Sequence, residues 1–367
     1  MSSEDRNIAE SGMLASPETL RRELPLPESL RWQIHGWRRT IIDILEGRDR
    51  RLLLIVGPCS IHHPEAALEY ALHLEKLSRQ VASSIFVVMR TYFEKPRTTL
   101  GWKGLIYDPD LNGEYNIEKG ILTARNLLLK IAAIGLPAAS EVLDPVMYAY
   151  FTDAISWAGI GARTTESPTH RQLASGLPMP VGFKNGTDGS LKTALEALTT
   201  VAAPHSFIGV MRNGHTGIFR TKGNPFCHLV LRGGSNGPNC SPKHLADAQL
   251  ILAEAGLRQR LLVDCSHGNS NKNIQLQKTV FESLMEQYCT GTSPLAGVML
   301  ESYLKEGNQL ITGDCPPRPD ISITDPCLGW EESEEIILKA QQQILSTSPY
   351  TTCGSCQSNQ FPQSNNP

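Results

Sequence analysis

The stretch RRLLLIVGPCS, residues 50–60, opens a repeating pattern that runs through most of this 367-residue chain. From there on, short apolar runs with β-branched residues alternate with longer segments of helical periodicity. Such apolar runs, separated by helices, are typical of a parallel sheet covered on its faces. The eight runs end near residues 57–59, 88–90, 140–142, 161–163, 182–184, 231–233, 264–267 and 299–301. They predict an α/β fold, namely a (β/α)8 TIM barrel spanning residues 51–345.

Residues 1–50 precede this pattern and form an N-terminal extension. Ser16 and Pro17 have the residue types of an N-cap and a first helical position, so a helix is expected to begin there. A second helix is expected near Glu28 to Glu46, because apolar residues recur in it at helical spacing. Its apolar stripe must pack on the body of the protein or on another subunit.

Two further segments depart from the barrel pattern. Asn213-Gly214 separates two strand-like runs, and this dipeptide predicts a β-hairpin, over about 205–222, inserted between the fifth and sixth barrel units. Residues 346–367 are rich in Ser, Asn, Gln and Pro and are expected to form a disordered tail. The pair Cys353 and Cys356 lies in this tail, without the nearby ligands that a zinc site needs.

The composition excludes several classes of protein. Apolar residues make up 40% of the chain and charged residues 19%, and the net charge is −3, so no basic field indicates nucleic acid or an anionic membrane as a partner. No apolar run approaches the roughly 20 residues of a membrane span, and the polar, acidic N-terminus does not resemble a signal peptide. The nine cysteines favour reduced thiols and a cytoplasmic location.

Each apolar run ends in a chemically capable side chain. In chain order these are Cys59, Arg90, Glu141, Arg163, Lys184, Arg232, His267 and Glu301. In a (β/α)8 barrel the strand ends form one mouth, where active sites lie. The cations among them predict an anionic ligand that carries phosphate or carboxylate groups. The alternative is that each cation pairs separately with a structural acid.

The remaining strand-end residues suit a metal ion. Cys59, His267 and Glu301, joined by Asp325 just beyond the last strand, offer donors for a borderline divalent ion such as Mn, Fe, Co or Zn. A Cys-His nucleophilic pair is the alternative, but it leaves both acids without a task. In the loop YFEKPRTTLGWKG, residues 92–104, Arg97, Thr98 and Thr99 could hold a second phosphate, unless the loop is simply a solvated basic segment.

Long motifs carry a family resemblance over about residues 15–340. They are GPCSIH, RTYFEKPRTTLGWKGL, IGARTTES, PVGFKNGTDGS, LRGG, VDCSHGNSNK, LESYLKEGNQ and SITDPCLGW. With them the chain resembles class I 3-deoxy-D-arabino-heptulosonate 7-phosphate (DAHP) synthases of the regulated bacterial and yeast type. The resemblance implies condensation of phosphoenolpyruvate with erythrose 4-phosphate, the first step of the shikimate pathway. The alternatives are another metal-dependent phosphosugar aldolase and an inactive regulatory paralogue that binds aromatic amino acids.

The resemblance also implies roles for individual residues. Cys59, His267, Glu301 and Asp325 would bind the metal, with Mn²⁺ preferred over Fe²⁺, Co²⁺ and Zn²⁺. Phosphoenolpyruvate would be surrounded by Arg90, Glu141, Ala162, Arg163, Lys184 and Arg232, and erythrose 4-phosphate by Lys95, Arg97 and Thr98. Lys95 would donate to the aldehyde oxygen as charge develops there. Glu141 and His267 are both candidates for activating the water.

The family likeness extends to regulation and assembly. It implies an aromatic amino acid effector, with tryptophan or tyrosine favoured, at a site to which the extension and the hairpin contribute. A homodimer or homotetramer is expected. The chain departs from the family at His63, where Asp is usual; if this position is an N-cap, the change costs about 1 kcal/mol of local stability.

Overall fold

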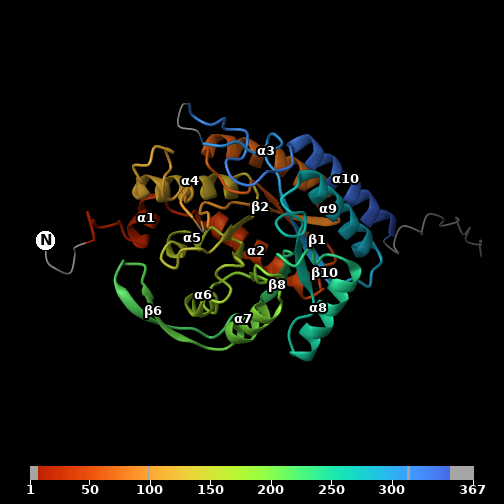
Figure 1. Cartoon of the computed structure of the whole chain (residues 1–367). Coiled ribbons are helices and arrows are strands. Elements are labelled where there is room, and N and C mark those ends of the chain that lie inside the picture. The colour runs from red at the N-terminus through yellow and green to blue at the C-terminus, as the bar shows by residue number, and fades with distance from the viewer. Residues whose placement is uncertain (1–6, 98, 312–314, 348–367) are drawn as a thin grey trace, which may run out of the picture.

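The computed structural model describes residues 7–97, 99–311 and 315–347, and they form a closed parallel barrel (Figure 1). Around the ring the strands follow the order β1-β10-β9-β8-β5-β4-β3-β2. Their bounds are β1 Leu52–Gly57, β2 Ile85–Arg90, β3 Ala138–Glu141, β4 Trp157–Ile160, β5 Val181–Lys184, β8 Cys227–Leu231, β9 Leu261–Asp264 and β10 Leu295–Glu301. The (β/α)8 prediction is confirmed, and each strand ends within about three residues of the expected position.

Helices surround this barrel, and most follow a strand in the alternation that the sequence predicts. Their bounds are α1 Pro17–Glu23, α2 Glu28–Leu45, α3 Pro64–Val81, α4 Ile117–Ala133, α5 Tyr148–Phe151, α6 Pro168–Ala174, α7 Lys192–Ala202, α8 Pro242–Glu254, α9 Ile274–Cys289 and α10 Trp330–Thr347. The barrel strands are buried almost throughout. Burial on both faces explains why these runs are apolar without alternation.

Helix α2 carries the apolar stripe of the extension. Its Ile41, Ile44 and Leu45 join the apolar cluster inside the barrel, together with Leu53 and Trp157. Figure 1 shows α2 in the middle of the ring of helices. The stripe therefore packs on the body of the same chain, where it closes the end of the barrel opposite the carboxyl ends of the strands.

A buried arginine connects the extension to the barrel wall. Arg125 of α4 is fully buried and contacts both carboxylate oxygens of Asp153 at 2.9 Å. Its Nε also donates to the carbonyl of Leu24, at the end of α1, at 2.9 Å. Because a buried guanidinium needs a partner for its charge, this contact fixes the position of α1 against α4.

The inserted hairpin is present as an antiparallel pair between α7 and β8. Strands β6 Ser206–Val210 and β7 Thr216–Arg220 flank the Asn213-Gly214 turn, and Gly214 has φ +87°, which glycine adopts without strain. The hairpin lies beside the barrel and carries Phe207 stacked on Phe219 with ring centroids 5.4 Å apart.

Helix starts agree with the expected caps, including the unusual one. Ser16 accepts a hydrogen bond from the Thr19 N–H at 3.2 Å. At α3 the N-cap is His63, whose Nδ1 accepts from the Ala66 N–H at 3.3 Å. Position 63 is therefore an N-cap, with an imidazole in place of the carboxylate usual in the family, and the cost of about 1 kcal/mol stays a prediction.

The C-terminal boundary shifts slightly from the expected one. Helix α10 continues to Thr347, so residues 346 and 347 are helical rather than part of a tail. The rest of the expected tail, with Cys353 and Cys356, lies outside the described residues. Within the described part of the chain, no helix combines the length and the apolar character needed to cross a bilayer.

Candidate active site

A cavity of about 250 Å³ opens at the carboxyl ends of the barrel strands. The predicted residues that line it are Arg90, Lys95, Arg97, Glu141, Ala162, Arg163, Lys184, Arg232, His267 and Asp325. Cys59 and Glu301 are buried and contact this lining, Cys59 through Lys95 and Glu301 through Arg90. Thr98 lies outside the described residues. The structure therefore brings the predicted side chains, Thr98 apart, to one mouth.

The four cations at the strand ends fall into two groups. Arg90 donates to Glu301 at 2.9 Å and stacks over the Tyr92 ring at 3.7 Å. Lys184 donates to Asp264 at 2.7 Å. Within the described residues, no carboxylate lies within 4.0 Å of the guanidinium of Arg163 or Arg232. Separate pairing with structural acids thus holds for the two buried cations, while the two nearer the rim stay available to an anion.

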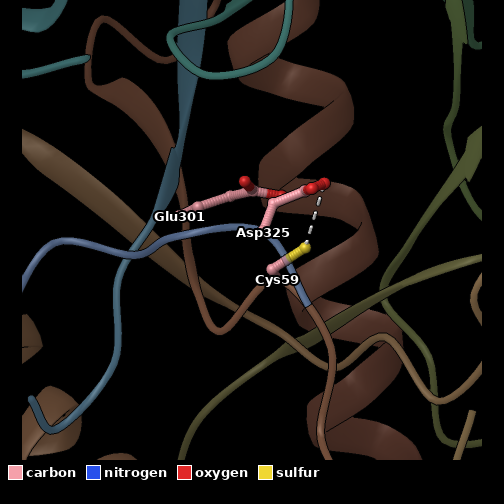
Figure 2. A group of neighbouring side chains, drawn as sticks. All are labelled: Cys59, Glu301 and Asp325. Carbon is pink, nitrogen blue, oxygen red and sulfur yellow. Dashed lines mark hydrogen bonds between the residues drawn. The ribbon is translucent and has the colours of Figure 1, made fainter. Parts of the chain in front are cut away.

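Cys59, Glu301 and Asp325 form a compact donor set. One ligand atom from each lies within 4.8 Å of the others, and Figure 2 shows the three side chains turned toward one another. The predicted fourth donor, His267, lies outside this set, with its Nε2 3.8 Å from Glu301 Oε1. A sulfur, an imidazole and two carboxylates in a buried site fit a borderline divalent ion. Among these residues lies the Lys95 ammonium, 2.7 Å from Cys59 Sγ and 3.0 Å from Asp325 Oδ2.

Several local contacts hold Asp325 in this position. Its second carboxylate oxygen accepts from Lys272 at 2.8 Å. Although burial opposes it, Lys95 and Lys272 hold the pKa of Asp325 well below its usual value. Ser322 donates to the Asp325 carbonyl at 2.8 Å, and Asn308 donates to the neighbouring Thr324 carbonyl at 2.8 Å. The loop therefore presents an ionised carboxylate to the mouth.

Comparison with known proteins places this geometry in a family. Residues 23–338 match the DAHP synthetase I family. The chain belongs to this family. It is 48% identical over 342 residues to the Tyr-sensitive phospho-2-dehydro-3-deoxyheptonate aldolase of Escherichia coli (strain K12), which covers 92% of this chain and 95% of that protein. The resemblance seen in the motifs is confirmed.

Further relatives agree with this assignment. The Trp-sensitive phospho-2-dehydro-3-deoxyheptonate aldolase of the same Escherichia coli strain is 46% identical over 331 residues, covering 90% of this chain and 95% of that protein. The solved structure of phospho-2-dehydro-3-deoxyheptonate aldolase from Francisella tularensis SCHU S4 superposes with a TM-score of 0.90 at 42% identity. That match covers 93% of this chain and 100% of the other.

In this DAHP synthetase I family member, sequence reasoning missed three acidic or basic residues at the mouth. Asp264 ends β9 and is fully buried between Lys184 and His267. Glu94 is buried next to Lys95, and Lys272 contacts Asp325. The sequence does carry a signal for Asp264, because it ends an apolar run, but the run continues to His267, which is the more typical metal ligand.

Glu94 sits in an unusual electrostatic setting. Burial, together with the nearby carboxylates of Asp144 and Glu141, raises the pKa of Glu94 to about 8, although hydrogen bonds from the Asp144 backbone and from Tyr107 oppose the shift. The unfolded chain has an ordinary glutamate pKa of about 4.3. Since the folded pKa is the higher one, protonated Glu94 stabilises the fold below about pH 4.3, and this contribution is lost as the pH rises through 8.

The substitution Glu94→Gln tests this balance, because glutamine stays neutral at every pH. Between about pH 5 and about pH 9, we expect the free energy of unfolding of the wild type to fall relative to that of the variant, by about 4 kcal/mol at most. Chemical denaturation across this range measures it. Glu114→Gln, at an exposed position, should follow the wild-type curve. Parallel curves for wild type and Glu94→Gln would contradict the assignment.

Proposed function

We propose that this chain is a 3-deoxy-7-phosphoheptulonate synthase, a transferase. It condenses phosphoenolpyruvate with D-erythrose 4-phosphate and water to give 3-deoxy-D-arabino-heptulosonate 7-phosphate and inorganic phosphate. This is the first step of the shikimate pathway toward aromatic amino acids. One observation carries the proposal: the Cys59, Glu301 and Asp325 donor set lies beside a cavity lined by Arg163 and Arg232, whose guanidinium groups have no carboxylate within 4.0 Å among the described residues. The names and identities of the relatives support it.

The cations divide between the two phosphorylated substrates. Phosphoenolpyruvate carries a carboxylate and a phosphate, which suit the planar forks of Arg163 and Arg232 together with the Lys184 ammonium. Ala162 lies beside Arg163 on the same strand end, and Arg90 forms the floor beneath. Arg97, whose Nε donates to the Trp102 carbonyl at 2.8 Å, is assigned with Thr98 to the phosphate of erythrose 4-phosphate.

Cys59, His267, Glu301 and Asp325 are assigned to hold the divalent ion, proposed as Mn²⁺ ahead of Fe²⁺, Co²⁺ and Zn²⁺. When bound, such an ion supplies Lewis-acid polarisation of the aldehyde oxygen. Lys95 lies within hydrogen-bond distance of two of these ligands. Its ammonium donates a hydrogen bond to the aldehyde oxygen as negative charge develops there, while the vinyl carbon of phosphoenolpyruvate forms the new C–C bond.

Water then adds at C2 of the former phosphoenolpyruvate, and C–O cleavage releases phosphate. Of the two candidates for activating this water, the geometry favours Glu141. Its half-buried carboxylate lines the cavity, and within the described residues no cation lies within 4.0 Å of it. His267, in contrast, has Nδ1 3.0 Å from Asp264 Oδ2, and its Nε2 is the nitrogen assigned to the ion.

Release of inorganic phosphate tests the proposed reaction. We expect release to require both phosphoenolpyruvate and erythrose 4-phosphate and to stop when EDTA removes the ion. A colorimetric phosphate assay with single-substrate controls measures this. Release that ignores both erythrose 4-phosphate and EDTA would contradict the synthase function, and absence of release under every metal tried would leave the two alternatives, a phosphosugar aldolase with another acceptor and an inactive paralogue.

Metal content tests the donor set separately from the reaction. The substitution Cys59→Ala removes the thiolate, so we expect bound Mn²⁺ after reloading and desalting to fall at least tenfold. Elemental analysis of the purified protein measures this. Cys227→Ala is the matched control, because this buried cysteine lies in β8 outside the donor set. Full occupancy in Cys59→Ala would refute the ligand role.

An aromatic amino acid effector is proposed to bind in a second cavity, of about 330 Å³, between α1, α5 and the hairpin. Phe207, Phe219 and Tyr148 offer apolar and aromatic surface there, and Arg21 and Arg212 offer cations for an α-carboxylate. This combination suits the ring and the carboxylate of tyrosine or tryptophan. The expected homodimer or homotetramer and the cytoplasmic location stay predictions.

Rates titrated with phenylalanine, tyrosine and tryptophan test the effector site. We expect tyrosine or tryptophan to inhibit, and Phe207→Ala to raise the inhibitory concentration at least tenfold by removing a ring from the cavity. Phe226→Ala, which removes a ring that lies under Arg258 outside this cavity, should leave inhibition unchanged. No response to any of the three amino acids, or unchanged inhibition in Phe207→Ala, would contradict the proposal.

A further inference from the structure

Asp264 is a fully buried carboxylate beneath the mouth that the proposed reaction leaves without a role. It is the last residue of β9, and its exposed fraction is 0%. A buried ionised carboxylate is costly unless charges and hydrogen bonds compensate it. Burial would raise the pKa of Asp264, but Lys184 and His267 outweigh it and hold the pKa well below its usual value. The carboxylate is therefore ionised where solvent cannot reach it.

The carboxylate has several donors, and they come from strand β5 and from the loop that follows β9. Oδ2 accepts from Lys184 of β5 at 2.7 Å and lies 3.0 Å from His267 Nδ1. Oδ1 accepts from the backbone N–H and the hydroxyl of Ser266, at 3.1 and 2.8 Å. The backbone is fixed too, since Asn269 Nδ2 donates to the Asp264 carbonyl at 2.8 Å. Asp264 thus links two residues that line the mouth.

These contacts determine which nitrogen of His267 carries a proton. The Ser266 hydroxyl donates its hydrogen to Asp264, so toward His267 Nδ1, 2.6 Å away, it can offer only a lone pair. Asp264 Oδ2 is likewise an acceptor. Because Asp264 Oδ2 can only accept, its contact with Nδ1 at 3.0 Å favours a proton on Nδ1, and the Ser266 hydroxyl then accepts from Nδ1 while it donates to Asp264. Nε2 is then the nitrogen that points toward Glu301 and the mouth.

Lys184 is held by the same oxygen. Its side chain is nearly buried and lines the mouth, so its ammonium direction is set by the contact with Asp264. Its remaining N–H groups stay available to an anionic ligand. A neutral side chain at position 264 could still accept one hydrogen bond, but it could not hold an ammonium and an imidazole N–H at one oxygen with the same strength.

We propose that Asp264 is a positioning residue for the reaction proposed above: it holds His267 with Nδ1 protonated and Nε2 toward the mouth, and it orients the Lys184 ammonium toward the substrate anion. It acts through these two side chains and does not touch substrate. The inference rests on the proposed function for its kinetic consequence only, because the tautomer of His267 exists without substrate or metal.

Nitrogen NMR of the metal-free, full-length protein with ¹⁵N-labelled histidine tests the tautomer directly. The chain has ten histidines, and the signal missing from His267→Gln identifies His267. We expect Nδ1 to carry the proton in the wild type and to lose it in part of the molecules in Asp264→Asn, because the Oδ2 acceptor is replaced. His228, whose Nε2 accepts from Trp157 at 3.1 Å, is the internal reference and should not change. A wild-type His267 with an unprotonated Nδ1 would overturn the proposal even if the variant did not fold.

Steady-state kinetics of the metal-loaded enzyme provide the second arm. For Asp264→Asn we expect kcat to fall about 100-fold while KM for phosphoenolpyruvate changes less than about fivefold, because misorientation of Lys184 is offset by the loss of a nearby negative charge. The matched control is Asp153→Asn, which also weakens a buried aspartate pair but lies outside the mouth. It should lower thermal stability, leave kcat within twofold of wild type and leave the His267 Nδ1 signal unchanged.

The two arms separate the possible failures. A kcat for Asp264→Asn within threefold of wild type, or an unchanged Nδ1 signal in that variant, would overturn the positioning role. If the wild type released no phosphate under any condition, the proposed function would fail, but the NMR arm would still report whether Asp264 sets the tautomer. Ser266→Ala, which keeps the charge of Asp264, should retain the protonated Nδ1, and loss of that proton there would assign the control to Ser266 instead.

Discussion

The hydrogen-bonded ladder between β1 and β10 closes the barrel, and the whole site depends on it. The register pairs Leu53 with Gly297 at one end and Gly57 with Glu301 at the other. Gly297 has to be glycine, because a Cβ there would collide with the Leu53 carbonyl. Since Cys59 lies two residues after Gly57, the first and last strands of the barrel bring a thiol and a carboxylate close together. Only a closed ring of strands can bring these two segments together.

Once the ring is closed, the floor of the mouth becomes a set of interlocked charges. Arg90 with Glu301, Lys184 with Asp264, and Lys95 with Asp325 each pair a cation with an acid. Removing one member of a buried pair leaves an uncompensated charge, at a cost of roughly 3–5 kcal/mol. These pairs fix the charge pattern of the floor. Besides the Lys184 ammonium, an anion that binds finds Arg163 and Arg232 nearer the rim, where these two have no acidic partner within the described residues.

The extension illustrates the limit of pattern reasoning. The stripe of α2 was readable from helical spacing, but the same stripe would have suited a subunit interface. The stripe is buried against the barrel interior because the end of the barrel opposite the carboxyl ends of the strands is apolar. Ile41, Ile44 and Leu45 pack there. For Glu94 the sequence gives no such pattern, because Asp144 and Glu141, which lie near it in the structure, are about fifty residues away along the chain.

The sequence by itself determined the barrel, the strand ends and the chemical types that meet at the mouth, because strand periodicity and the parallel topology are local properties that accumulate along the chain. It also determined the family, through long motifs. The tertiary structure alone decided which charges pair. Whether Arg90, Lys184, Arg163 or Arg232 faces an acid depends on distances of a few ångströms between different strands, and Asp264 acquires its partners only when β5 and the loop after β9 meet. Coulombic pairing at such range is a property of the folded ring and not of any one segment.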